Sequence, residues 1–278
     1  PVSLALGASG IVRAAALERP NSSRLCLPVI VDLLFISTPE FADQLWMNPT
    51  FCVGEMAAVG LWRTDWITEG PTRTAARVLV LPFHVTSLES EGKSHLATSW
   101  STARQFLEDV IVLAERWPEV EFIIRGKDVS WATQIMEPTF TLGLNFPQNL
   151  RIDDDYSTMY RSYDLVSSSE IVVGKYTSLL DEAALAGRAS IVHDAYPGGG
   201  NSYKDWSFLP ETASVARTSE DFVELVNSTV ESFLRKVSSE EDVWKPTRHA
   251  LCDGAVRERM ISRLEKELET TRQVSSAR

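Results

Sequence analysis

The chain has 278 residues, 44% of them hydrophobic, and a formal net charge of -11 at pH 7. This length can bury one large hydrophobic core or two moderate ones. The excess of carboxylates argues against a nucleic-acid partner, because phosphate backbones select surfaces rich in Lys and Arg. The three cysteines, Cys26, Cys52 and Cys252, are widely spaced, so we expect neither a disulfide framework nor a cysteine-based zinc site. A reducing, cytoplasmic location is the simplest expectation.

The longest apolar stretch covers residues 26–36 (CLPVIVDLLFI) and predicts a buried strand. It is shorter than the roughly 20 residues that a membrane-spanning helix needs, and Pro28 and Asp32 interrupt it. The first residues show no charged region followed by an apolar segment and a cleavage site, so we expect no secretory signal.

A polar segment at residues 67–77, which contains Gly70 and Pro71, predicts a boundary near residue 70. The expected organisation is a partial N-terminal region at 1–70 and a larger domain at 71–278. Fewer than about 100 residues rarely make a full two-layer domain, so we expect the first region to be incomplete.

Strands and helices alternate after this boundary. The predicted strands are 77–83, 120–126, 149–152, 170–174 and 189–194, and the predicted helices are 99–117, one opened by Asp155, 178–187, 219–238 and 254–272. Continuous apolar strands without polar alternation are typical of a parallel sheet that is covered on both faces. The sequence therefore predicts an α/β, Rossmann-like parallel sheet with right-handed crossovers and helices on both faces.

The segment SEIVVGKYTSLLDEAALAG places Thr177 and Ser178 where a predicted strand leads into a helix. Ser178 is a suitable N-cap, Asp181 three residues later completes an imperfect capping box, and Gly187 suits the helix exit. The first-turn N–H groups of a helix carry partial positive charge and bind anions, to which the two hydroxyls would add donors. A phosphate cradle is the functional interpretation. The structural alternative is that Ser178 only caps the helix.

Glu182 lies one turn into the same predicted helix. Its carboxylate could accept hydrogen bonds from the hydroxyls of a ribose. The alternative is an ordinary solvated side chain, which is where most glutamates are found.

The order of four segments in the chain resembles that of a known family. The order of RVLVLPFHVTS, VEFIIRGKD, SYDLVSSSEIVVGKYTSLLDEAALAGRASIVHD and LCDGAVRERMISRLEKEL is similar to the C-terminal, donor-binding half of GT-B glycosyltransferases. The closest group is the bacterial surface-polysaccharide enzymes, which include teichoic-acid glycerophosphotransferases and the Kdo transferases of capsule and lipopolysaccharide. The resemblance covers roughly residues 50 to 270 and rests on order and context. In that group a hydroxyl pair binds the donor phosphate, and Thr177-Ser178 matches it.

The resemblance also implies other donor contacts. The family has a basic His-Pro motif after an earlier strand, but this sequence has Lys127-Asp128 there, with Arg125 nearby. Arg125 and Lys127 are therefore expected to contact the donor, from the tip of a strand that neighbours the one before the hydroxyl pair. A solvated strand end is the alternative. The family often lines its cleft with the loop that here carries His84 and Ser87, although a non-catalytic His84 is an equal alternative.

The segment CVGEMAAVGLWRTDWI resembles the linker end of the family's N-terminal domain. There, Gly60, Arg63 and Asp65 match a common Gly-x-x-Arg-x-Asp pattern. The segment DGAVRERM resembles the family's last Rossmann helix.

Three further features are interpreted as structural. Asp153-Asp154-Asp155 imitates an acidic metal site but precedes a predicted helix, where Asp favours capping. The run 198–200 of three glycines lacks the Lys-Ser/Thr of a P-loop, so a loop is expected. His193 is accompanied by no Ser or Cys nucleophile motif, which leaves a hydrolase weakly supported.

The resemblance implies a glycosyltransferase that moves a sugar or polyol phosphate from a nucleotide-activated donor, with a cytidine nucleotide favoured, onto a bacterial surface glycan. It further implies a glycan or glycolipid acceptor, a position at the periphery of the cytoplasmic membrane, and no metal or other cofactor besides the donor substrate. Two alternatives remain open. One is an enzyme like the sugar-nucleotide 2-epimerases, which share the twin-domain fold, and the other is a non-catalytic nucleotide-binding module that lacks its acceptor half.

Overall fold

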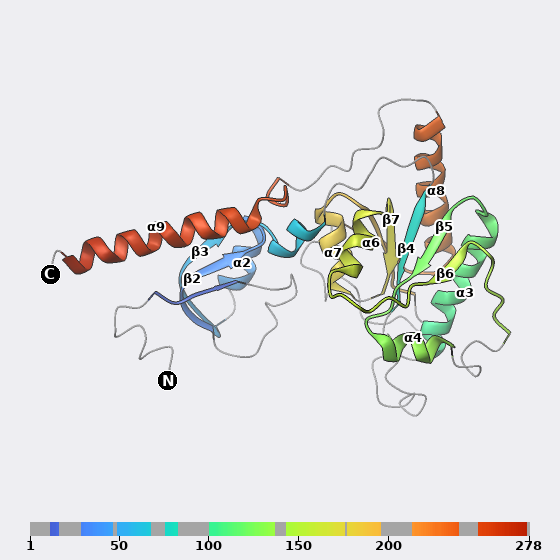
Figure 1. The fold of residues 1–278 in the computed structure, drawn as a ribbon, viewed down its shortest axis with the longest axis horizontal. Helices are drawn as coiled ribbons and strands as arrows, with labels where there is room; N and C mark the ends of the chain where they lie inside the picture. The colour runs from blue at the N-terminus through green and yellow to red at the C-terminus, as the bar shows by residue number, and fades with distance from the viewer. Residues whose placement is uncertain are drawn as a thin grey trace. The chain divides into compact units, whose positions relative to one another are not determined.

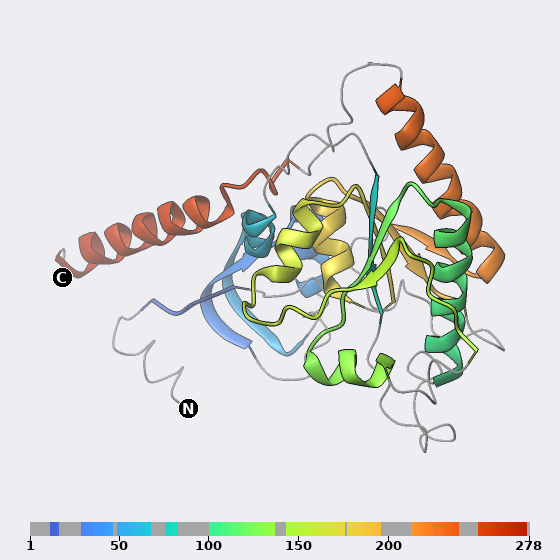
Figure 2. The same cartoon turned by 45° about the vertical axis from the view of Figure 1, so that its right-hand side comes forward.

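The structure, a computed structural model, describes residues 12–16, 29–46, 49–67, 76–82, 100–136, 143–175, 177–195, 213–238 and 250–276. The chain forms two compact units (Figures 1 and 2), one of Pro1–Asp65 with Arg248–Arg278 and the other of Trp66–Thr247. Each unit has its own parallel sheet. Among the described helices, none combines the length and the apolar character needed to cross a bilayer.

The second unit contains a six-stranded parallel sheet in the order β6-β5-β4-β7-β8-β9. The strands are β4 (Arg77–Leu81), β5 (Glu121–Ile124), β6 (Leu150–Ile152), β7 (Ile171–Gly174), β8 (Ala189–His193) and β9 (Ser214–Ala216). β4 pairs with β5 on one side and with β7 on the other. The chain therefore builds the sheet in one direction from β4 and then returns to build it in the other, as a Rossmann-like fold does.

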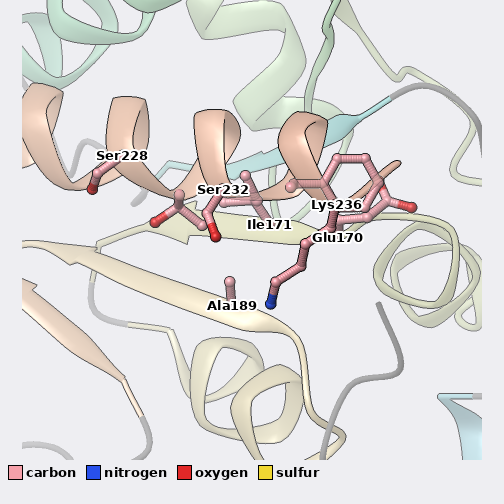
Figure 3. A pocket seen from close by; sticks show the side chains of 8 residues that line it. Glu170, Ile171, Ala189, Ser228, Ser232 and Lys236 are labelled. Carbon is pink, nitrogen blue, oxygen red and sulfur yellow. The ribbon is translucent and has the colours of Figure 1, made fainter. Parts of the chain in front are cut away.

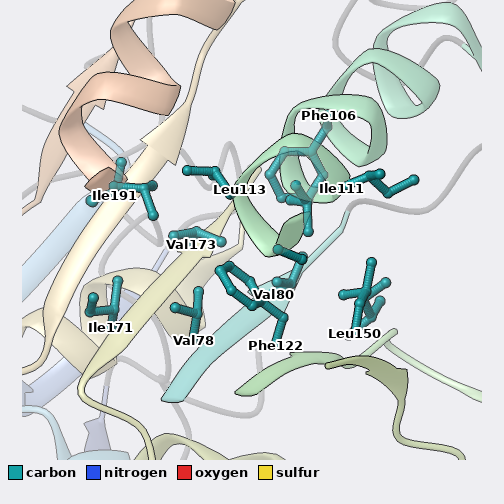
Figure 4. Close-up of a cluster of buried hydrophobic side chains, with 14 of the residues drawn as sticks. Val78, Val80, Phe106, Ile111, Leu113, Phe122, Leu150, Ile171, Val173 and Ile191 are labelled. Atoms are coloured by element: carbon teal, nitrogen blue, oxygen red, sulfur yellow. The ribbon is translucent and has the colours of Figure 1, made fainter. Parts of the chain in front are cut away.

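Helices cover both faces of this sheet (Figure 1). They are α3 (Trp100–Arg116), α4 (Val129–Met136), α6 (Arg161–Ser167), α7 (Ser178–Leu185) and α8 (Ser219–Ser238). On one face, Val78 and Val80 of β4 join a buried cluster with Phe106 of α3 (Figure 4). Phe222 of α8 belongs to the same cluster. On the other face, strand residues pack against α6 and α7. Burial on both sides explains why these strands are apolar throughout and confirms the predicted fold class.

One predicted helix start in this unit is wrong. The helix expected to open at Asp155 begins at Arg161, and its N-cap residue, Tyr160, makes no side-chain capping bond. Asp155 Oδ1 instead accepts hydrogen bonds from the backbone N–H of Ser157 at 3.0 Å and from its hydroxyl at 2.5 Å. Asp is favoured in turns as well as at helix starts, and here the turn precedes the helix.

The first unit has a three-stranded parallel sheet in the order β1-β2-β3. Its elements are β1 (Ala14–Ala16), β2 (Val29–Ile36), α2 (Pro39–Trp46), β3 (Phe51–Ala58), the 3-10 helix η2 (Trp62–Trp66), whose last residue begins the second unit, and α9 (Val256–Ser276). The buried strand predicted within residues 26–36 is confirmed by β2 over its described part. β3 lies in the segment that resembles the linker end of the family's N-terminal domain.

The last helix belongs to the first unit, which differs from the expected division at 1–70 and 71–278. Val256 of α9 is fully buried against Leu33 and Phe35 of β2. The Arg259 guanidinium also donates a hydrogen bond to the carbonyl oxygen of Val59 at 2.9 Å. These contacts join residues about 200 positions apart, and the periodicity of a helix does not reveal which sheet it packs on.

Gly60 and Asp65, two residues of the Gly-x-x-Arg-x-Asp pattern, hold the C-terminal segment. Gly60 has a φ of 99°, and a Cβ there would lie 1.9 Å from the carbonyl oxygen of Leu251, so a side chain does not fit. The Asp65 carboxylate accepts hydrogen bonds from the backbone N–H groups of Val256 at 3.1 Å and Arg257 at 2.8 Å. Asp65 therefore caps the start of α9 from a distant part of the sequence.

We expect Asp65→Ala to lower the free energy of unfolding of the first unit by about 1 kcal/mol, the usual value of a helix cap. Hydrogen exchange should show faster exchange at the amides of Val256 and Arg257, whose acceptor is lost. Glu265→Gln, an exposed change on the same helix, serves as the control and should leave both amides unaffected. Equal exchange in the Asp65 variant and the parent protein would contradict the capping role.

Candidate functional site

The carboxyl ends of parallel strands lie at one edge of the sheet, here called the carboxyl edge and defined by Leu81, Ile124, Gly174 and His193. The direction of chain progression reverses between β4 and β7. In open α/β sheets, ligands bind outside the carboxyl ends of the strands at such a reversal. A Cβ on Gly174 would lie 2.5 Å from the carbonyl oxygen of Leu81, so β4 and β7 approach each other too closely there for a side chain.

Helix α7 begins at this reversal, directly after β7. Thr177 is its N-cap residue, with extended backbone angles, and its hydroxyl accepts a hydrogen bond from the backbone N–H of Leu179 at 3.3 Å. The expectation that Ser178 is the cap is therefore wrong by one residue, since Ser178 is the first helical residue. Both residues are half-buried at the positively polarised end of the helix.

The other end of α7 is fixed by a Schellman motif. Gly187 has a φ of 82°, its N–H bonds to the carbonyl of Ala184, and the N–H of Arg188 bonds to the carbonyl of Ala183, both at 2.9 Å. This confirms the predicted role of Gly187 at the helix exit. Leu180 and Ala183 are fully buried against the sheet. Caps at both ends and these buried contacts therefore fix the position of α7 and of its N-terminus.

Glu182 lies on α7 one turn after Ser178 and is 1% exposed. The alternative of a solvated glutamate therefore does not describe this side chain. Its contact with a ribose remains a prediction.

Lys127 is exposed in the turn between β5 and α4, at the same carboxyl edge. The sequence interpretation put its strand directly beside the one that precedes Thr177, but β4 lies between them. With neighbouring strands about 4.8 Å apart, the ends of β5 and β7 are separated by about 10 Å, which a long lysine side chain can partly bridge.

Arg125 is also at this edge but its guanidinium is 4% exposed and already bound. Its Nη1 donates hydrogen bonds to Asp153 Oδ2 at 2.8 Å and to the carbonyl oxygen of Asp155 at 2.7 Å. The guanidinium carbon also lies 3.9 Å from the ring centroid of Tyr156. These contacts fix the loop after β6, so the structure gives Arg125 a clear supporting role, and its contact with a donor remains a prediction.

Two residues of the acidic triplet at 153–155, Asp153 and Asp155, are likewise held in structural hydrogen bonds. Asp153 is buried and accepts hydrogen bonds from Arg161 as well as Arg125, the closest at 2.6 Å. Within the described ranges, no three His, Cys, Asp or Glu side chains are arranged to hold a metal ion.

A buried ionisable cluster lies at the carboxyl ends of β7 and β8, and the sequence reasoning missed it as a unit. His193 is fully buried, and its Nε2 is 2.7 Å from Asp109 Oδ2 of α3. The rings of Phe106 and Phe222 contact the imidazole edge-on. Lys175, immediately after β7, is 1% exposed. A lysine that directly continues an apolar strand, as in IVVGK, was the signal that could have revealed it.

Burial lowers the pKa of the Lys175 ammonium to about 7, although the negative charges of Asp194 and Asp109 oppose the shift. Burial likewise lowers the pKa of His193, against the effect of its hydrogen bond to Asp109. The cluster therefore keeps two bases, an amine and an imidazole, at the functional edge of the sheet. Perturbed groups of this kind concentrate at functional sites.

A hollow of about 220 Å³ lies at the opposite, amino end of the strands (Figure 3). Glu170, Ile171 and Ala189 line it from the sheet, and Ser228, Ser232 and Lys236 line it from α8. It is smaller than the roughly 300 Å³ at the lower end of ordinary ligand sites, and it is far from the strand ends where such folds bind ligands. We therefore do not assign the donor to it.

Three sequence expectations lie outside the described residues. They are the proposed donor contacts His84 and Ser87 and the glycine run at 198–200.

Replacing Lys175 tests its burial. Because its folded pKa is below its unfolded pKa, the unfolded chain binds more protons between about pH 7 and 10.5, and the stability of the parent protein should rise with pH across this window. Lys175→Met should be more stable at pH 7 by a few kcal/mol, since one pKa unit corresponds to about 1.4 kcal/mol, and the gain should shrink toward pH 10.5. Urea unfolding at several pH values measures both effects.

The exposed change Lys127→Met is the matched control, and its unfolding free energy should stay within about 0.5 kcal/mol of the parent at every pH. A Lys175→Met protein that is less stable than the parent at pH 7 would show that the ammonium is well compensated in the folded state.

No protein-family model and no curated protein sequence matches the chain. Solved structures do match. A putative UDP-N-acetylglucosamine 2-epimerase from Listeria monocytogenes is 11% identical, with a TM-score of 0.60, and the match covers 96% of this chain and 71% of that one. The UDP-GlcNAc 2-epimerase of Methanocaldococcus jannaschii, solved with UDP-GlcNAc and UDP, is 12% identical, with a TM-score of 0.58 and coverage of 95% and 78%.

A structure of the wall teichoic acid polymerase TagF with CDPG is 9% identical, with a TM-score of 0.45, and the match covers 86% of this chain and 58% of that one. A score this low carries no argument about this chain. At identities of 11–12%, the two epimerase matches show the fold alone. The chain thus has the α/β, Rossmann-like architecture of the GT-B type.

Proposed function

We propose that the chain binds a nucleotide-activated sugar or polyol at the carboxyl edge of its second unit and acts as a transferase. The observation that carries this proposal is the position of the α7 N-terminus, with Thr177 and Ser178, at the reversal between β4 and β7. A diphosphate placed there would meet a positively polarised helix end and two hydroxyl groups. The net charge of -11 makes such a local site necessary, because the chain as a whole repels anions.

The chemistry that fits this arrangement is largely electrostatic. When the bond to the transferred group breaks, the departing nucleotide phosphate gains negative charge, and preorganised donors stabilise it. The helix N-terminus and Ser178 would supply directed hydrogen bonds, and Lys127 would supply positive charge from the neighbouring part of the edge. Glu182 is proposed to accept hydrogen bonds from the ribose.

A cytidine nucleotide donor and a bacterial surface glycan or glycolipid acceptor follow from the resemblance to surface-polysaccharide transferases. Such an acceptor would bring the protein to the periphery of the cytoplasmic membrane. The matched epimerase from Methanocaldococcus jannaschii was solved with UDP and UDP-GlcNAc. Uridine and cytidine nucleotides therefore both belong in any binding test.

A sugar-nucleotide 2-epimerase is the second candidate. Two fold matches favour it. One is to a UDP-GlcNAc 2-epimerase, with a TM-score of 0.58, and the other is to a putative UDP-N-acetylglucosamine 2-epimerase, with a TM-score of 0.60. A transferase and an epimerase would use the same nucleotide site, so the location of the donor does not separate them. The products do.

Thermal unfolding with CMP, CDP, UDP and GDP tests the nucleotide site. A nucleotide that binds the folded state raises the melting temperature by mass action, and we expect CDP or UDP to do so. Ser178→Ala and Lys127→Ala should each weaken binding by about tenfold to a hundredfold, since one hydrogen bond to a charged group contributes about 1.5 to 3 kcal/mol. Neither change should lower the melting temperature of the free protein by more than a few degrees.

The start of α8 provides a matched control. There, Thr218 accepts a hydrogen bond from the N–H of Asp221 at 3.0 Å and is followed by Ser219, which repeats the Thr-Ser pair of α7 at a helix that follows the outermost strand, β9. Ser219→Ala should leave nucleotide affinity unchanged. Equal weakening by Ser219→Ala and Ser178→Ala, or no weakening by Ser178→Ala and Lys127→Ala, would remove the α7 site.

Product analysis separates the two enzyme candidates. A transferase should release nucleotide from its donor only when an acceptor is present, whereas a 2-epimerase should convert UDP-GlcNAc to its C2 epimer with no release of UDP. Nuclear magnetic resonance of the reaction mixture distinguishes these products. Nucleotide binding without either reaction would favour the non-catalytic binding module.

A further inference from the structure

The hollow at the amino end of β7 and β8 is separate from the proposed nucleotide site. It lies on the α8 face of the sheet, because Ile171 of β7 and Phe233 of α8, which both line it, belong to the same buried cluster. Helix α7 packs on the opposite face. β7 runs from Ile171 to Gly174, so its two ends are about 10 Å apart at about 3.3 Å per residue. The hollow and the nucleotide site therefore differ in both edge and face.

The floor of the hollow is apolar. Ile171 and Phe233 are buried, and Ala189, the first residue of β8, is half-buried. A floor of this kind removes one apolar face of a ligand from water, while a few polar groups around it fix the orientation of the ligand.

Helix α8 supplies polar groups along one side. Ser228, Ser232 and Lys236 lie on the side of α8 that faces β7 and β8 (Figure 3). The Ser228 hydroxyl donates its hydrogen to the carbonyl oxygen of Leu225 at 3.0 Å, and the Thr229 hydroxyl donates to the same oxygen at 2.7 Å. Because a hydroxyl has only one hydrogen, the oxygens of Ser228 and Thr229 act toward a ligand as acceptors.

Glu170 adds a carboxylate to the lining, directly before β7. It is 8% exposed, and its Oε2 accepts a hydrogen bond from the backbone N–H of Arg77 at 2.8 Å. A carboxylate has about four lone-pair sites, and this bond uses one of them. The hollow is therefore lined by several acceptors, which suit a ligand that carries several O–H donors.

Lys236 brings a positive charge to the same hollow. It is exposed and lies in the last turn of α8, so its ammonium is at the rim. A cation is favourable at the C-terminus of any helix, so a test of Lys236 has to measure ligand binding and not stability. The rim suits one anionic group, and the acceptors suit the hydroxyls of the same ligand.

We propose that this hollow binds a monosaccharide phosphate as a second ligand, independent of the nucleotide. The ring hydroxyls donate to Glu170 and to the oxygens of Ser228 and Thr229. The C–H face of the ring packs on Phe233, and the phosphate pairs with Lys236. The volume of about 220 Å³ suits one sugar ring, since sites for drug-sized ligands begin at about 300 Å³. A nucleotide-activated sugar is too large for it.

Nuclear magnetic resonance of the backbone amides tests this site. Glucose 1-phosphate and glucose 6-phosphate are titrated separately into the full chain. We expect at least one of them to cause saturable shifts at the amides of Ala189, Ser232 and Lys236. Glucose, which has no charged group, and inorganic phosphate, which has no ring, should each bind at least about tenfold more weakly. Addition of UDP should leave these shifts in place.

Two exposed positions on α8 provide the variants. Lys236→Met should weaken binding of the sugar phosphate by about tenfold or more, since it removes a charged hydrogen bond. Ser232→Phe should abolish binding, because a large ring at this position fills the hollow. Lys127→Met, an exposed lysine change at the carboxyl edge, is the control and should leave the affinity unchanged. Circular dichroism confirms that the variants are folded.

Four results would overturn the proposal. They are the absence of saturable shifts with both sugar phosphates, equal affinity for inorganic phosphate and the sugar phosphate, equal affinity in Ser232→Phe and the parent protein, and loss of binding in Lys127→Met but not in Lys236→Met. The last result would move the sugar phosphate to the carboxyl edge. Since these probes contain no nucleotide, their failure leaves the proposed nucleotide site standing, and a failure of UDP and CDP to bind leaves this site standing.

Discussion

The structure of the second unit depends on one constraint, the placement of all six strands in parallel with a reversal of order between β4 and β7. Parallel pairing brings every strand end to a single edge, and the reversal leaves the connections after β4 and β7 running to opposite faces. The close approach of Gly174 to Leu81 and the fixed position of α7 follow from this arrangement. The proposed nucleotide site lies at that edge.

The two sides of the carboxyl edge differ in how a buried positive charge is stabilised. After β5 and β6, Arg125 is buried but fully engaged by Asp153 and the backbone, so its cost of burial is offset by directed contacts. After β7, Lys175 is buried where desolvation dominates, and its pKa falls to about 7. The first arrangement makes a loop rigid, whereas the second leaves a base whose charge responds to its surroundings.

The sequence was sufficient for the architecture of the second unit, because apolar strands between amphipathic helices report local burial directly. It also predicted α8 at its observed bounds and Gly187 at the end of α7, because helical periodicity and a helix-ending glycine are local signals as well. It failed where long-range contacts decide. β4 separates the strand before Lys127 from β7, and the approach of α3 and β8 completes the buried surroundings of Lys175. A local error also occurred, because the cap of α7 is Thr177 and not Ser178. The Gly60 and Asp65 pattern was seen, but its purpose needed the distant α9.

The return of α9 to the first unit makes that unit discontinuous, with residues from both ends of the sequence in one core. Domains generally fold as units during synthesis, N-terminal parts first. In this chain the first unit cannot complete its core before the second unit has been synthesised. The second unit is synthesised in full while the first still lacks the helix that covers Leu33 and Phe35, so this apolar surface of β2 stays uncovered until α9 has been made.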